Sequence, residues 1–129
     1  MKNNMKTLLL PEYWKSFVIN NDLVGKEVEF PWPDEEDLDA IIEILDDENV
    51  ELEANELWPG IGIKDDGYFS VAGCSIGTGN QYCINIHDGK NGPLYLVDHE
   101  RVGPEGYDKK EAISIMLNHY EDLLKFLKN

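Results

Sequence analysis

Two segments in the first half of the chain carry apolar residues at the spacing of an amphipathic helix. Between residues 11 and 20 they recur at intervals of three and four, Pro11 suits the first helical position, and Asn20-Asn21-Asp22 ends the pattern. Residues 33–49 repeat this spacing, so the sequence predicts a second helix that begins at Pro33-Asp34. The two apolar stripes are Tyr13, Trp14, Phe17 and Val18 in the first segment, and Leu38, Ile41, Ile42 and Leu45 in the second.

From Trp58 onward the period changes to the alternation that is typical of strands. It predicts strands at residues 61–64, 68–72, 82–86 and 94–97, and the last of these, a continuous apolar run, is interpreted as the central strand. Residues 65–67 predict a turn, and the glycines of residues 88–92 favour a hairpin loop.

The last segment, residues 108–127, returns to helical spacing. Asp108 and Glu111 stand at the distance of a capping box, which predicts the start of a C-terminal helix. Its core-facing stripe comprises Ile113, Met116, Leu117, Tyr120, Leu124 and Leu127. Helices, then an antiparallel sheet, then a helix predict an α+β fold, and without an internal break residues 1–129 form one domain.

The composition is that of a folded protein, and no residue spacing predicts a metal or cofactor. With 129 residues, of which 42% are hydrophobic, the chain is long enough to bury a core of its own. Cys74 and Cys83 match no zinc spacing, and we expect both to be thiols. The N-terminal segment has no secretory pattern and no run is long enough to span a membrane, so we expect a cytoplasmic protein.

The net charge of −15 is concentrated in one block, since residues 27–63 hold fourteen Asp and Glu and no Lys or Arg. Such a block disfavours binding to nucleic acid or to an anionic membrane and favours a basic partner, or none. On a helix over residues 33–49, several acids gather opposite the apolar stripe, where like charges at i,i+4 cost stability. We therefore predict a binding face for a basic partner, made of Glu36, Asp39, Glu43, Asp46, Asp47, Glu51, Glu53 and Glu56. The alternative is a solvated face that only aids solubility.

Three short motifs contain residue types that active sites use, and each has a simpler structural interpretation. Gly77-Thr78-Gly79 lacks the lysine and the helix of a phosphate loop, which favours a turn between strands. His87-Asp88 lacks a recognisable nucleophile, and Asp98-His99-Glu100 would alternate across a strand. These patterns predict no catalysis; the enzymatic alternative is a small hydrolase that uses Asp65, Asp66, Asp98 and Glu100.

Several stretches together resemble the SUKH superfamily, which includes fungal cell-wall-synthesis regulators and bacterial immunity proteins. The similar residues are Leu10-Pro11-Glu12-Tyr13-Trp14-Lys15, Gly62-Ile63, Ile76-Gly77-Thr78-Gly79 and Gly92 to Glu100. The family's frequent Asn-Gly-Gly after the first helix is replaced by Asn20-Asn21-Asp22. The resemblance implies an α+β fold, no catalysis and a protein partner. That partner is expected to be a toxin, often a nuclease; a regulatory or scaffolding role with another cellular partner is the alternative, and the oligomeric state stays open.

Overall fold

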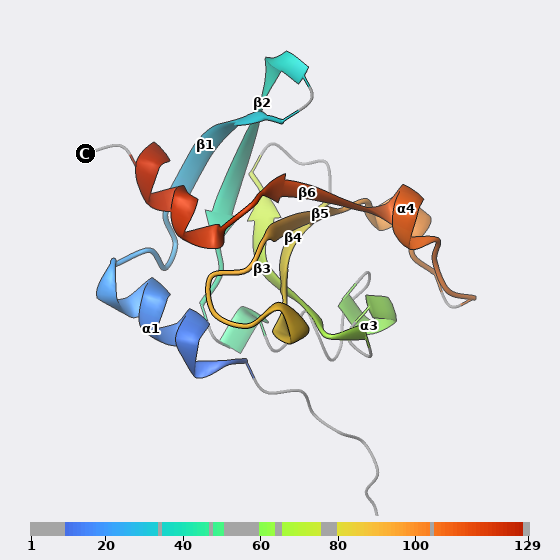
Figure 1. The fold of residues 1–129 in the computed structure, drawn as a ribbon, viewed down its shortest axis with the longest axis horizontal. Helices are drawn as coiled ribbons and strands as arrows, with labels where there is room; N and C mark the ends of the chain where they lie inside the picture. The colour runs from blue at the N-terminus through green and yellow to red at the C-terminus, as the bar shows by residue number, and fades with distance from the viewer. Residues whose placement is uncertain are drawn as a thin grey trace, which may run out of the picture.

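The fold is a six-stranded antiparallel sheet with helical segments near both ends of the chain (Figure 1). The computed structural model describes residues 10–33, 35–46, 48–50, 60–63, 66–75, 80–103 and 105–127. Within these ranges the strands follow one another in the sheet in the order β1-β2-β3-β4-β5-β6, and each pair is antiparallel. The predicted α+β class is confirmed.

The first predicted helix is present as α1, Glu12–Asn20. Its apolar stripe packs inward, with Trp14, Phe17 and Val18 all buried. Pro11 lies one position earlier than predicted, at the N-cap with extended backbone, and the amides of Trp14 and Lys15 donate to its carbonyl.

The second predicted helix is wrong, because this segment forms a β-hairpin with the residues before it. β1, Glu27–Trp32, pairs with β2, Glu35–Ile44. In β2 the buried residues Ala40, Ile42 and Ile44 alternate with more exposed ones, which is the period of a strand. The strand prevails because β1 has the matching alternation, so that both strands can bury one face against the same core.

In the middle of the chain, three of the four predicted strands are confirmed. They are β3 (Tyr68–Cys74), β4 (Gln81–Asn85) and β5 (Leu94–Val97), and the short 3-10 helix η2 (Ile86–Asp88) opens the loop between β4 and β5. β5 lies next to the edge strand and not at the centre of the sheet. Residues 60–63 form the short helix α3 (Gly60–Ile63), where a strand was predicted; Ile63 is fully buried, so one turn of helix satisfies the same apolar position.

The predicted C-terminal helix is also wrong beyond its first turn. Asp108 does cap a helix, α4 (Lys109–Ala112), by accepting a hydrogen bond from the Lys110 amide. The chain then becomes β6 (Ile113–Leu117), which pairs with β5, and ends in the 3-10 helix η4 (Tyr120–Phe126). The edge of β5 offers backbone partners to this segment, and that pairing replaces the hydrogen bonds of a longer helix.

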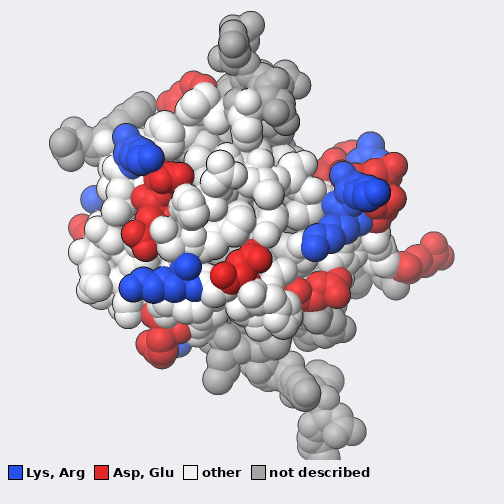
Figure 2. Space-filling view, in the orientation of Figure 1, with Lys and Arg blue, Asp and Glu red and all other residues white. Residues whose placement is uncertain are grey.

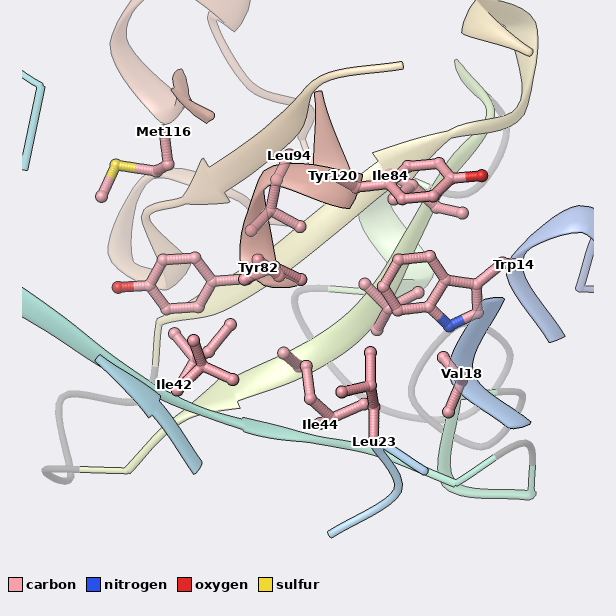
Figure 3. Packing of buried hydrophobic residues seen from close by; sticks show 14 of the residues in the cluster. Trp14, Val18, Leu23, Ile42, Ile44, Tyr82, Ile84, Leu94, Met116 and Tyr120 are labelled. Carbon is pink, nitrogen blue, oxygen red and sulfur yellow. The ribbon is translucent and has the colours of Figure 1, made fainter. Parts of the chain in front are cut away.

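Apolar side chains pack on both faces of the sheet. The larger cluster joins the sheet to α1 and η4, and Figure 3 shows Trp14 and Tyr120 beside each other within it. Their rings meet edge to face, with 5.1 Å between the centroids. The predicted core position of Trp14 is confirmed. The second cluster comprises Ile63, Tyr68, Cys83, Val97, Val102, Ala112 and Ile113.

The two cysteines do not form a disulfide. Cys83 is buried beside Ser70, with 3.6 Å between Sγ and Oγ, and Cys74 is half-buried at the other end of β3.

Candidate functional site

The predicted acidic face does not lie on a helix, but part of it survives on the hairpin. Asp39 and Glu43 are exposed on the outer face of β2, because Ala40, Ile42 and Ile44 take the inner face. Asp46 is exposed just after the strand, where its carboxylate accepts a hydrogen bond from the Asn49 amide at 2.8 Å. The helical grouping of these three residues is therefore wrong.

The other predicted acidic residues lie beyond what can be placed. Glu36 belongs to β2, but its side chain is outside the description. Outside the described residues altogether are Asp47, Glu51, Glu53 and Glu56.

The hairpin brings two further acids to the same face that the prediction missed. Glu27 and Glu29 alternate with the buried Val28 and Phe30 of β1, so they point outward. Glu27 lies directly opposite Glu43 in the register, and it accepts a hydrogen bond from the Ser75 hydroxyl. The alternation of glutamate and apolar residues from 27 to 30 was the signal for this strand. We call the four residues Glu27, Glu29, Asp39 and Glu43 the acidic hairpin face.

Lys and Arg are located mainly elsewhere among the described residues. On the face seen in Figure 2, blue side chains gather over α4, where they are mixed with acidic ones. One such contact is Arg101, whose guanidinium reaches both Asp98 and Glu111, at 3.5 and 3.2 Å. Because β1 is one edge of the sheet and α4 leads into the other edge strand, the acidic hairpin face is separate from this mixed region.

A second feature is a cleft of about 670 Å³ beside the smaller apolar cluster. Three tyrosines, two aspartates and one lysine give it aromatic and charged walls. We call it the tyrosine–carboxylate cleft, and its lining includes Asp66, Tyr68, Asp88, Tyr95, Tyr107 and Lys109.

Two of its tyrosines donate to its two aspartates. The Tyr95 hydroxyl donates to Oδ2 of Asp88 at 2.7 Å, and the Tyr107 hydroxyl donates to Oδ2 of Asp66. Burial raises the pKa of Tyr95 and of Tyr107, and these hydrogen bonds raise each pKa further because they stabilise the protonated phenol. Both phenols therefore remain donors at neutral pH.

The third tyrosine, Tyr68, is in a different state. Only 1% of it is exposed, and its hydroxyl has no hydrogen-bond partner within the described part of the chain. Its ring meets that of Tyr95 edge to face at 5.3 Å, and the Lys109 ammonium lies 5.8 Å from its centroid.

The turn before β3 and the end of β4 hold the floor of this cleft in place. The Asn85 side chain donates to the Asp66 carbonyl at 3.1 Å and accepts from the His87 amide at 2.8 Å. Gly67, at φ +97°, lies against the His87 ring; a Cβ there would come within 2.7 Å of Cδ2. Only glycine fits that backbone and that approach.

The motifs considered from sequence fall partly inside this cleft. His87 and Asp88 are exposed in the loop after β4, and both line the cleft. Asp98 caps the short 3-10 helix η3 (His99–Arg101), and the His99 ring is 2.7 Å from the Asn80 amide oxygen. Gly77-Thr78-Gly79 lies outside the described residues, between the paired strands β3 and β4.

The carboxylates of the hydrolase alternative do not all converge. Asp66 lines the cleft, whereas Asp98 and Glu100 lie at η3 and are not among the lining residues. Asp65 lies outside the described residues. The tyrosines that dominate the cleft come from three separate segments, and no sequence motif links them.

Neither a metal site nor a membrane-spanning helix is found among the described residues. Among these residues no group of three or more His, Cys, Asp or Glu could hold a metal ion. No helix within the same ranges has the length and apolar character needed to cross a membrane. Comparison with known proteins finds no matching family model, curated protein or solved structure.

Proposed function

We propose that this protein is a binding module for a basic protein, and that it serves as a SUKH-type immunity protein whose partner is a toxin. The observation that carries the proposal is the acidic hairpin face, where Glu27 and Glu43 are directly opposite each other on neighbouring strands. Like charges in this arrangement destabilise a sheet, so their grouping is better explained by a partner than by the fold.

The charge distribution supports the same partner chemistry. The segment that contains the hairpin, residues 27–63, has no Lys or Arg, and the chain as a whole has a net charge of −15. A field of one sign accelerates encounters with a partner of opposite charge, and opposed charge pairs in the complex then add specificity. The cationic nucleic-acid groove of a nuclease is a surface of this kind.

The test uses the product of a toxin-like reading frame adjacent to the one for this chain. Co-expression of the two proteins should restore growth, and an inactive variant of the toxin should bind the purified protein. The double variant Asp39→Lys/Glu43→Lys should associate about tenfold more slowly at low salt, with a smaller difference at high salt. Unchanged association would show that the acidic hairpin face is only a solvated surface.

A matched control separates local charge from net charge. Glu12→Lys/Glu100→Lys reverses the same number of charges at exposed positions outside the hairpin, and it should leave the association rate close to that of the parent. If both double variants slow association equally, the partner responds to net charge alone. Binding to another cellular protein without rescue from any toxin would favour the regulatory or scaffolding alternative.

A further inference from the structure

The tyrosine–carboxylate cleft is not used by the proposed interface, since it lies beside α4 and not on the β1–β2 hairpin. We propose that this cleft binds a guanidinium group, the head of an arginine side chain presented by a protein partner. The inference rests on the proposed function only for the source of the arginine; the chemistry of the cleft carries the rest.

The cleft contains more hydrogen-bond acceptors than donors. Each of the two aspartates accepts one phenol hydrogen, yet an ionised carboxylate can accept about four hydrogen bonds. The buried Tyr68 hydroxyl has no partner among the described residues, and its oxygen can accept a further hydrogen bond. A ligand that completes this set must bring several N–H or O–H donors.

Among such ligands, the aromatic walls favour a flat cation. Tyr68 and Tyr95 meet at 90°, so that each ring presents a different surface to the space beside it. A guanidinium group stacks on aromatic rings and carries five donors in a plane that fits a carboxylate. The ammonium of Lys109, 5.8 Å from the centre of the Tyr68 ring, shows that this wall already accommodates one cation.

The same groups disfavour other ligands. An anionic ligand would be repelled by Asp66 and Asp88, and among the described residues Lys109 is the one lysine in the cleft lining. An apolar ligand would leave the Tyr68 hydroxyl without a partner and would give each carboxylate no donor beyond its one tyrosine, which is costly. Lys109 is itself exposed on α4 and can leave the ring when a guanidinium group enters.

The first experiment measures binding of a minimal probe to the purified protein by NMR titration. The probe is acetyl-Gly-Arg-Gly-amide, and the control peptide contains citrulline, which has the same shape without the charge. The arginine peptide should shift the ring signals of Tyr68, Tyr95 and Tyr107 with millimolar affinity, and the citrulline peptide should bind at least about tenfold more weakly. Equal binding of the two peptides would overturn the proposal, and equal binding of a lysine peptide would overturn the assignment to guanidinium.

Two variants then test the residues that carry the inference. Tyr68→Phe removes the buried acceptor, so it should weaken binding of the arginine peptide by about tenfold, while the unliganded protein melts no lower than the parent. Lys109→Gln removes the competing cation and should tighten binding severalfold, whereas an anionic ligand would require the opposite. As a control, Tyr13→Phe removes another buried hydroxyl that lies outside the cleft, and it should change nothing.

The outcomes separate this proposal from the one before it. Because the peptide titration contains no partner protein, its failure would remove the guanidinium site and leave the acidic hairpin face untouched. Loss of peptide binding in Tyr68→Phe together with a lower melting temperature would instead show a structural role for the hydroxyl and would contradict the inference.

Discussion

Changing Glu43 to Lys should stabilise the protein, although it would abolish part of its proposed binding surface. Glu43 is exposed on β2 and lies directly opposite Glu27 on β1, with the two side chains on the same face of the sheet. Side chains in such a pair have Cβ atoms about 4.5–5.5 Å apart, close enough for direct interaction. The substitution Glu43→Lys turns a pair of like charges into an ion pair without changing the strand or its register.

The size of the effect follows from this geometry. A cross-strand charge pair is worth about 0.2–1 kcal/mol, and the substitution both removes a repulsion and creates an attraction, which gives about 0.4–2 kcal/mol in total. At about 2.1 cal/mol/K per residue, 129 residues have an unfolding entropy of about 270 cal/mol/K. A gain of about 1 kcal/mol therefore raises the melting temperature by roughly 4 °C.

Thermal unfolding monitored by circular dichroism at low and at high salt measures this gain. The control is Glu105→Lys, which reverses an exposed charge in the loop before α4 and reports the benefit of a lower net charge alone. In about 1 M salt, where the screening length is about 3 Å, the advantage of Glu43→Lys over the control should shrink. If the two variants have the same melting temperature at low salt, Glu27 and Glu43 do not repel each other. That result would contradict the register that places them opposite each other.

Two further predictions concern the C-terminal segment and the tyrosines. Leu123→Ala should cost about 2–5 kcal/mol because Leu123 is fully buried in η4, whereas Leu124→Ala should cost less than about 1 kcal/mol, since Leu124 is 38% exposed. Denaturant unfolding measures both losses of stability. If Leu124→Ala cost more than Leu123→Ala, the result would support the long C-terminal helix that the sequence predicted. Burial raises the pKa of Tyr82 to about 12 and also raises those of Tyr95 and Tyr107. In the unfolded chain these phenols ionise near their ordinary pKa of 10.0, whereas in the folded protein they keep their protons to a higher pH. The free energy of unfolding should therefore be unaffected by them below pH 10 and fall as the pH rises above it. A free energy of unfolding that stays constant up to pH 12 would contradict the burial of these phenols.

The segments where sequence prediction failed are those whose apolar pattern fits two periods. In residues 38–45 the stripe of Leu38, Ile41, Ile42 and Leu45 fits a helix, but Ala40, Ile42 and Ile44 fit a strand equally well. Short apolar runs cannot be resolved by periodicity alone, and here the partner strand decides. The same holds at the C-terminus, where pairing with β5 recruits Ile113–Leu117.

Segments with one dominant period were predicted correctly. α1 has a single apolar stripe, and β3, β4 and β5 are bounded by turn residues, so local signals and tertiary packing agree there. The cleft could not be predicted, because Tyr68, Tyr95 and Tyr107 converge only after β3, β5 and the loop before α4 are in place. The acidity of the hairpin, by contrast, was visible in the sequence, and only its geometry was missed.

The unbroken order of the strands has a consequence for how the chain folds. Each strand pairs with its neighbours in sequence, so the sheet can grow by one strand at a time, although the connections from β2 to β3 (residues 45–67) and from β5 to β6 (residues 98–112) are long. Elements from the two ends of the chain also meet, because η4 packs against β1 and Tyr120 of η4 contacts the Trp14 ring of α1. Pairing between strands that are neighbours in sequence lowers the contact order and favours rapid folding. Packing of η4 against β1, by contrast, requires that both ends of the chain be present.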